Sequence, residues 1–170
     1  VETRLVHEDV EKERMTRLKA ALDQKQVEIR GTKEIAGVIP CEEATPEDNT
    51  REYLDYMLSV KPVADVYEAI DHINCFGSHH TDCIVTENAQ TAETFMDLVD
   101  SAGVYQNCST RFADGYRYGF GAEVGISTGK IHARGPVGLE GLLSYKDKLY
   151  GHGQIVEDYA SGEKQFHFKD

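Results

Sequence analysis

The sequence predicts an α/β protein built on an open parallel β-sheet. Short apolar segments of strand length alternate along the chain with segments whose apolar residues recur at helical spacing. This alternation is typical of parallel sheets, in which helices connect neighbouring strands. Ligands of such sheets bind beyond the carboxyl ends of the strands. A glycine-rich stretch follows directly after the predicted strand Gly103 to Gln106, so we expect the functional site there.

Each element is predicted from its own local pattern. The helix that follows Pro62 is the clearest case, since Asp65 is a suitable N-cap, Gly77 a suitable stop, and Val66, Ile70 and Ile73 share one face. The expected order is strand 3–7, a helix from 8 to about 25, strand 27–30, a solvated loop 40–52, strand 56–60, helix 65–76, strand 83–86, helix 90–99, strand 103–106, a helical turn ending at 142, and strand 143–150. The tail after Gly151 is expected to be loosely ordered.

Composition and charge exclude several classes of protein. The net charge of −12 is concentrated in residues 41–100, where 14 acids face 2 bases. Such a surface repels phosphate backbones, which argues against a nucleic-acid partner. The chain has no run of about 18 apolar residues and no apolar stretch after a basic N-terminus, so we expect neither a membrane partner nor a signal peptide.

The cysteines and the length indicate one domain from a reducing compartment. The four cysteines show no CxxC or zinc-type spacing, and a chain of 170 residues does not need disulfides. The first residues resemble the interior of a strand, so we expect the chain to be a piece of a longer protein. We assign residues 1–142 to one domain and residues 143–170 to a protruding strand and tail.

The glycine-rich stretch is expected to be an ordered loop. Eight of the 15 glycines fall between Gly115 and Gly141. Glycines separated by aromatic and charged residues indicate positive φ angles or close approach to a ligand, not a flexible linker. The apolar residues between them are expected to be buried: Phe112, Tyr116, Tyr118, Phe120, Val124 and Ile126.

The residues suggest four kinds of chemistry. The segment Gly119 to Gly125 fails the spacing and context of a dinucleotide fingerprint. His79 and His80 are adjacent and point to opposite faces of an extended segment, so a shared metal is not expected. Cys108 is better explained as a small buried thiol than as an activated one. Arg111 and Arg134 are the better candidates, because guanidinium binds carboxylate or phosphate, although pairing with Asp114 or Glu123 would explain them equally well.

Three motifs together resemble a known enzyme family. They are Val63-x5-Ala-Ile-Asp-His-Ile73 running into Phe76-Gly-Ser-His-His-Thr-Asp82, then Asn107-Cys-Ser-Thr-Arg-Phe-Ala-Asp-Gly115, then Gly121-Ala-Glu-Val-Gly-Ile-Ser-Thr128 with His132-Ala-Arg-Gly-Pro136. They resemble gamma-glutamyl phosphate reductase, also called glutamate-5-semialdehyde dehydrogenase, over most of residues 1–155. The segment Tyr116 to Phe120 is more similar to the fungal or eukaryotic form than to the bacterial one.

The resemblance implies the catalytic domain of an aldehyde dehydrogenase-type enzyme of proline biosynthesis. In such an enzyme NADPH reduces a thioester formed from L-glutamyl 5-phosphate, giving L-glutamate 5-semialdehyde and phosphate. The nucleophilic Cys would fall just before Val1 and the nucleotide-binding Rossmann domain further upstream. The resemblance therefore implies that no catalytic residue lies in this chain and that the chain alone is inactive.

The resemblance also assigns site residues and partners. Glu52 and Leu54 would contact the cofactor, with the carboxylate accepting from the ribose hydroxyls. The substrate would be lined by Asn107, Ser109, Thr110, Arg111, Phe112 and His80, with Asp82 in support. Residues 143–150 would join a second subunit's sheet in a homo-oligomer.

Two rival interpretations stay open. The isolated chain could be a non-catalytic substrate-binding or assembly module, and a His-based metal hydrolase would carry a stoichiometric ion. We expect a cytoplasmic location, or a mitochondrial one for a fused eukaryotic synthase.

Overall fold

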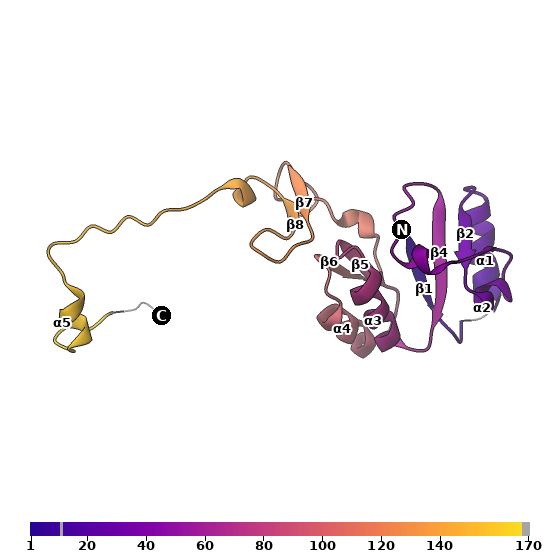
Figure 1. Cartoon of the computed structure of the whole chain (residues 1–170), viewed down its shortest axis with the longest axis horizontal. Helices are drawn as coiled ribbons and strands as arrows, with labels where there is room; N and C mark the ends of the chain where they lie inside the picture. Colours follow the sequence, from indigo (N-terminus) through magenta and orange to yellow (C-terminus); the bar gives the residue numbers. More distant parts are fainter. Residues whose placement is uncertain (11, 168–170) are drawn as a thin grey trace.

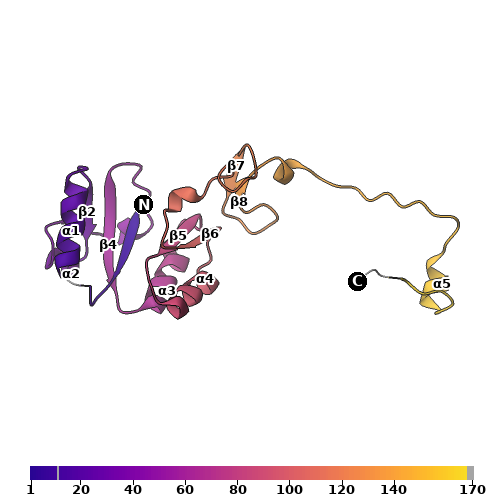
Figure 2. The ribbon, with the colours of Figure 1, turned by 180° about the vertical axis from the view of Figure 1, so that it is seen from behind.

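The computed structural model describes residues 1–10 and 12–167. The elements follow one another along the longest axis, from a four-stranded sheet at one end to an extended tail at the other (Figure 1). The view from behind shows the same succession (Figure 2). No helix in the described part of the chain is long and apolar enough to cross a membrane.

The first layer is a parallel sheet with strand order β1-β4-β2-β3. Residues Thr3 to His7 of β1 pair with Ser59 to Val63 of β4, and β2 pairs with the beginning of β4. The strands are β1 Thr3–His7, β2 Glu28–Gly31, β3 Glu42–Glu43 and β4 Met57–Val63. The central strand β4 is the most buried, since Leu58, Ser59 and Val60 are each less than 9% exposed, which suits its apolar sequence.

Two helices pack on this sheet and enclose its core. They are α1, Lys12–Asp23, and α2, Lys33–Ala36. Met15 of α1 and Ile35 of α2 are buried together with Ile29 of β2. A Cβ atom on Gly31 would come within 2.7 Å of Cys41 Sγ and of the Ile35 side chain, so glycine is required where β2 turns into α2.

A second parallel unit has its own core. It consists of α3 Val66–Phe76, β5 Thr81–Ile84, α4 Ala89–Leu98 and β6 Gly103–Gln106. The strands β5 and β6 form a separate two-stranded parallel sheet, and Ile70, Phe95 and Val99 pack between the helices and this sheet. Asp65 caps α3 by accepting from Glu68 N at 2.9 Å, and Asn88 caps α4 by accepting from Thr91 N at 2.9 Å.

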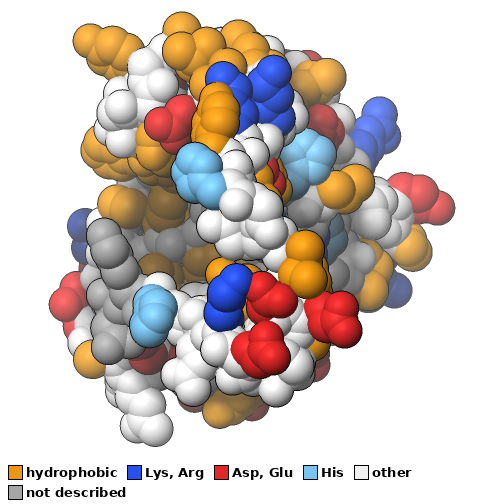
Figure 3. All heavy atoms as spheres, turned by 90° about the vertical axis from the view of Figure 1, so that its left-hand side faces the viewer, with side chains coloured by type: hydrophobic (Ala, Val, Ile, Leu, Met, Phe, Trp, Pro, Cys, Tyr) orange, Lys and Arg blue, Asp and Glu red, His pale blue; other side chains and the backbone are white. Residues whose placement is uncertain are grey.

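The last part of the chain is a small hairpin and a tail. Strands β7, Gly125–Ser127, and β8, Gly135–Val137, pair antiparallel, and a 3₁₀ turn follows at Glu140–Leu142. The chain then runs on in extended form to α5, Val156–Ala160. Figure 3 shows the molecule from its tail end, and the surface seen there carries many hydrophobic side chains among acidic and basic ones.

The predicted strands and helices of residues 3–106 are confirmed with small shifts, and several other predictions are wrong. The strand expected at 83–86 begins at Thr81, and the loop 40–52 contains β3 and a 3₁₀ turn. The strands fall into two parallel sheets and not one. Residues 143–150 form no strand among the described residues, and their pairing with a second subunit stays a prediction. The tail, expected to be loosely ordered, contains α5.

The expected burial of the apolar residues in the glycine-rich stretch is also wrong. A two-stranded hairpin and its loops are too small to enclose their own side chains. The exposed fractions are 54% for Phe112, 81% for Tyr116, 39% for Tyr118, 58% for Phe120, 61% for Val124 and 45% for Ile126. The positive φ angles are confirmed at Gly119 (82°), Gly121 (81°) and Gly135 (72°).

Candidate functional site

The predicted cofactor residues lie on the loop that leads into β4. Glu52 is exposed, and its carboxylate has no hydrogen-bond or ion-pair partner within residues 1–10 and 12–167. Leu54 is 91% exposed and has a φ of 52°, in the left-handed region that a residue with a side chain seldom adopts. An open depression beside the loop is lined by Val1, Glu2 and residues 53–57. Apolar and acidic groups therefore meet next to the first residue of the chain.

A buried carboxylate holds this loop in place. Asp48 is 2% exposed and lies in the 3₁₀ turn Pro46–Asn49. Its Oδ2 accepts from the Thr45 backbone N at 2.7 Å and from Thr45 Oγ1 at 3.0 Å. Its Oδ1 accepts from Tyr53 Oη at 2.7 Å and from Arg30 Nη1 at 3.2 Å. The carboxylate thus joins both ends of the loop to strand β2.

The titration of the cluster reflects these contacts. Burial alone would raise the pKa of Asp48, but the donors from Thr45, Tyr53 and Arg30 together lower it to about 2. Burial, followed by the hydrogen bond to Asp48, raises the pKa of Tyr53 to about 12. Asp48 is therefore a carboxylate and Tyr53 a phenol near neutral pH. The hydrogen bond between Asp48 and Tyr53 contributes to both shifts, beside the Thr45 and Arg30 donors at Asp48 and burial at Tyr53.

Sequence reasoning missed this cluster, although a signal for it exists. Thr45-Pro46-Glu-Asp48 has an N-cap residue, Pro at the next position and an acid three residues after the cap, which is the pattern of a capping box. The composition of residues 40–52 suggested a solvated loop, and the acid of that pattern is instead the most buried acidic side chain described.

The predicted substrate segment begins where β6 ends. Asn107 has a φ of 52° and is exposed. Its side-chain oxygen accepts from Thr86 N at 2.9 Å, and its side-chain nitrogen donates to Thr86 O at 2.9 Å. Asn107 therefore joins the chain after β5 to the end of β6. This amide is already engaged by the backbone and fixes the direction in which the next residues leave the sheet.

The next residues form a short turn that displays Arg111 and Phe112. Ser109 Oγ accepts from Arg111 N at 3.2 Å, which starts the 3₁₀ turn Thr110–Phe112. The Arg111 backbone O accepts from Arg117 Nη1 at 2.6 Å. The Arg111 guanidinium is exposed and has no partner among the described residues, and Phe112 is 54% exposed. This turn can offer one free cation and one apolar ring to an anionic ligand.

The other arginines of the stretch are already paired. Arg134 Nη2 donates to Asp100 Oδ1 at 2.9 Å, and Lys130 pairs with the same carboxylate. Arg117 pairs with Asp114 at 3.1 Å. Arg134 is thus paired, but with Asp100, an acid that the sequence did not suggest for it. Arg111 is the cation left for a ligand in the part of this stretch that the structure describes.

His80 and Asp82 lie at the beginning of β5. His80 Nδ1 is 2.7 Å from Thr81 Oγ1. Asp82 Oδ2 accepts from Ser101 Oγ at 2.6 Å, and burial raises the pKa of this carboxyl. His79 Nδ1 is 2.9 Å from Asp100 O. The two histidines do not share a ligand-binding geometry, and no group of three or more His, Cys, Asp or Glu in residues 1–10 and 12–167 is placed to hold a metal ion.

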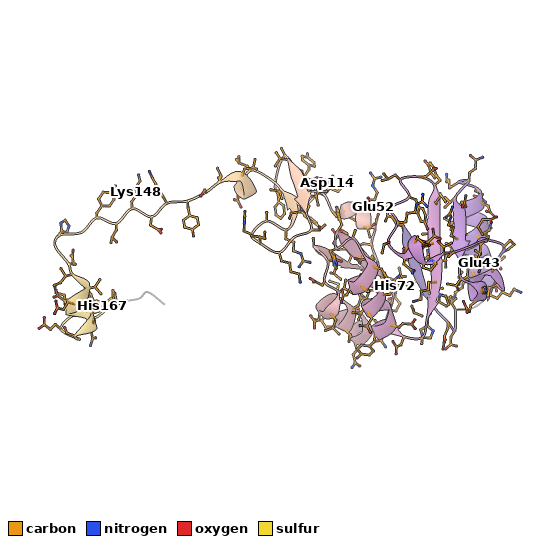
Figure 4. All side chains as sticks on the ribbon, in the orientation of Figure 1. Glu43, Glu52, His72, Asp114, Lys148 and His167 are labelled. Atoms are coloured by element: carbon orange, nitrogen blue, oxygen red, sulfur yellow. The ribbon has the colours of Figure 1, made fainter. Side chains whose placement is uncertain are left out.

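Figure 4 labels one residue of the predicted cofactor loop and one residue that follows the Arg111 turn. Glu52 and Asp114, which follows the Arg111 turn, are labelled in the upper part of Figure 4, and His72 of α3 lies below them.

Comparison with known proteins identifies relatives for this arrangement. No family model matches the chain. Gamma-glutamyl phosphate reductase of Acetivibrio thermocellus is 61% identical over 165 residues, which are 97% of this chain and 38% of that protein. The enzyme of the same name from Picosynechococcus is 53% identical over 171 residues, 100% of this chain and 40% of that protein.

Two solved structures with the same name share the fold. The structure from Thermotoga maritima has a TM-score of 0.86 at 43% identity and covers 90% of this chain and 37% of that one. The structure from Saccharomyces cerevisiae has a TM-score of 0.52 at 31% identity, over 92% of this chain and 36% of that one. The expected closeness to the fungal or eukaryotic form is not confirmed, since the relatives of higher identity are bacterial. Over nearly its whole length the chain is similar to one segment of these gamma-glutamyl phosphate reductases, and it spans about 38% of the length of the curated relatives.

Proposed function

We propose that the chain is the catalytic-domain segment of an NADPH-dependent reductase of proline biosynthesis. The enzyme would convert L-glutamyl 5-phosphate to L-glutamate 5-semialdehyde and phosphate. The observation that carries the proposal is the match to the Thermotoga maritima reductase, which combines a TM-score of 0.86 with 43% identity over 90% of the chain. The proposal includes an aldehyde dehydrogenase-type architecture for the whole enzyme.

The residues of the 52–54 loop fit a nicotinamide cofactor. An unpaired exposed carboxylate at Glu52 can accept from two ribose hydroxyls, and the Leu54 side chain, 91% exposed, can pack against a flat ring. When bound, the cofactor supplies the hydride. The loop would hold the nicotinamide end, whereas the Rossmann domain that binds most of the cofactor would lie outside the chain.

The Arg111 turn fits the substrate. An unpaired guanidinium binds carboxylate or phosphate through parallel N–H donors, and Phe112 can cover the methylenes between these groups. In the proposed site Asn107 fixes the direction of the turn through Thr86, while Ser109 and Thr110 shape it. His80 would approach from the beginning of β5.

The nucleophile of the reaction would precede Val1. Its thiolate would displace phosphate from the acyl phosphate to form a thioester, and hydride transfer to the thioester would release the aldehyde and restore the thiolate. The depression lined by Val1, Glu2 and residues 53–57 supports this placement, because it joins the chain start to the cofactor loop. The chain alone would bind and orient but not react.

The tail supports a second candidate function, that of an assembly module. Leu143 is 68% exposed, Tyr145 91%, Leu149 98% and Tyr150 84%. An extended segment that alternates exposed apolar and polar side chains, and that has no neighbouring strand among the described residues, can add to the sheet of a second copy. We propose a homo-oligomer joined through 143–150, located in the cytoplasm.

A chimera tests the reductase proposal. This chain would replace the corresponding segment of the Acetivibrio thermocellus reductase, and phosphate-dependent NADP⁺ reduction by glutamate 5-semialdehyde would be measured. We expect turnover by the chimera, none by the 170-residue chain, and a rise of at least about tenfold in the Michaelis constant for phosphate or semialdehyde on Arg111→Ala. A folded but inactive chimera would contradict the reductase proposal, and turnover by the chain alone would contradict the placement of the nucleophile.

The assembly proposal has its own measurement. Sedimentation of the chain, and of a variant ending at residue 142, would give their molecular masses. We expect self-association of the chain and a monomeric truncated variant. Equal masses would remove the tail as the interface.

A further inference from the structure

We propose that Asp48 is a positioning residue for the cofactor, acting through Tyr53 on the loop that carries Glu52 and Leu54. The inference rests on the proposed cofactor role of that loop. Asp48 itself would not touch the cofactor. It would fix the backbone from which the two contacting side chains project.

The hydrogen bonds of Asp48 span the whole loop. The donors from Thr45 stand at its beginning, the phenol of Tyr53 stands near its end, and Arg30 belongs to strand β2. These four bonds use both oxygens of a side chain that is 2% exposed. A loop tied at both ends to one carboxylate, and through Arg30 to a sheet, has little freedom to change shape.

Tyr53 occupies the position that matters for the predicted contacts. It lies between Glu52 and Leu54, so fixing its side chain fixes the directions of both neighbours. The Arg30 guanidinium carbon is 5.8 Å from the Tyr53 ring centre and that of Arg51 is 6.0 Å away. Cationic groups at these distances attract the ring and add to its anchorage.

The conformation of Leu54 requires such an anchor. Its φ of 52° is unfavourable for a branched side chain, and its 91% exposure means that local packing does not hold it. Strained residues persist only where the surrounding structure fixes them, and they gather at functional sites. The bond from Tyr53 to Asp48 lies one residue before Leu54 and supplies this constraint.

The cluster is a support and not a ligand site. The donors around Asp48 lower its pKa to about 2, so the carboxylate is ionised, and its charge is balanced by Arg30. Glu52, four residues later, is exposed and unpaired among the described residues. Asp48 therefore holds the loop, and Glu52 remains free to accept hydrogen bonds from a ligand.

The first test measures the loop in the 170-residue chain. Arg51 is exposed, so trypsin cleavage after it reports how firmly the loop is held. We expect cleavage at least about tenfold faster in Asp48→Asn and somewhat faster in Tyr53→Phe. The matched control is Glu47→Gln, which alters the exposed acid next to Asp48 and should cleave at the unmodified rate. Equal rates in all four proteins would overturn the anchoring role.

The second test measures NADPH in the chimera described above. NADPH fluorescence would give its dissociation constant for the unmodified chimera and for each variant. We expect Asp48→Asn to weaken NADPH binding about tenfold while the Michaelis constant for glutamate 5-semialdehyde stays within twofold, and Glu47→Gln to change neither. An unchanged NADPH constant in Asp48→Asn would overturn the positioning role, as would equal losses for cofactor and semialdehyde, which indicate a general structural defect. The proposed reductase function is judged separately, by turnover of the unmodified chimera.

Discussion

Acid should weaken the protein through Asp48, and the size of the effect follows from its contacts. The folded pKa of about 2 lies below the ordinary value of 3.8. A depressed folded pKa contributes stability that is fully present above about pH 4 and is lost as the pH falls through 2. The difference between these two pKa values corresponds to at most about 2.5 kcal/mol near neutral pH. It is an upper bound because Arg30, one of the partners, keeps 27% of its side-chain surface in water.

Urea unfolding at pH 6 and pH 3 would measure this contribution. Comparing the wild type with Asp48→Asn isolates it from the titration of the other carboxyls. We expect Asp48→Asn to be less stable than the wild type by about 2 kcal/mol at pH 6 and by about half as much at pH 3. Glu47→Gln should differ by less than about 0.5 kcal/mol at both pH values. A gap of the same size at pH 6 and pH 3 would refute the link between the ionised carboxylate and its four donors.

Three further substitutions or modifications test the fold and the thiols. Phe95→Ala removes a side chain that is 3% exposed in the second core and should lower the free energy of unfolding in urea by about 3–5 kcal/mol. Met96→Ala, at the next position, which is 41% exposed, should lower it far less. Similar losses for the two variants would contradict the placement of this core. Asp65→Ala removes the N-cap of α3 and should cost about 1 kcal/mol, whereas Asp71→Ala on the exposed part of the same helix should be nearly neutral by the same measurement. Burial raises the pKa of the Cys41 thiol, so iodoacetamide at pH 8 should modify it more slowly than the exposed cysteines, as mass spectrometry would show; equal rates would mean that the core around it opens readily.

The sequence predicted the elements whose pattern is local. Helix α3 was found because Asp65, Gly77 and the apolar spacing between them all indicate the same helix. The strand Gly103–Gln106 was found with its exact bounds, since it is a short apolar run between clear turn signals. The residues within such an element are sufficient to predict it.

Elements that depend on a distant partner could not be predicted in this way. The two acidic residues of β3 become a strand only because β2 lies beside them. The hairpin of β7 and β8 was not predicted, because the glycines around it suggest a loop. At 143–150 alternation suggests a strand, the described chain supplies no neighbour, and pairing with a second subunit stays a prediction. Pairing, not propensity, decides these cases.

The candidate site likewise combines residues that a local pattern predicts with contacts that depend on distant parts of the chain. Motifs and the position of a strand end indicate Asn107 and Arg111, and the Arg111 guanidinium is exposed without a partner in residues 1–10 and 12–167. The ion pair of Arg134 with Asp100 joins residues 34 positions apart, so no local sequence pattern predicts it. The Asp48 cluster joins β2 to a loop 18 residues later, and its burial depends on the sheet.

The two apolar clusters are built from separate stretches of the chain. All buried members of the first lie between Val6 and Val60, and those of the second lie between Ile70 and Val99. Each cluster can therefore close through contacts made within its own stretch of the chain. The protein should consequently open in two cooperative units, with amide hydrogens of β4 and of α4 exchanging in separate groups. During synthesis the first unit can fold before the second has been made.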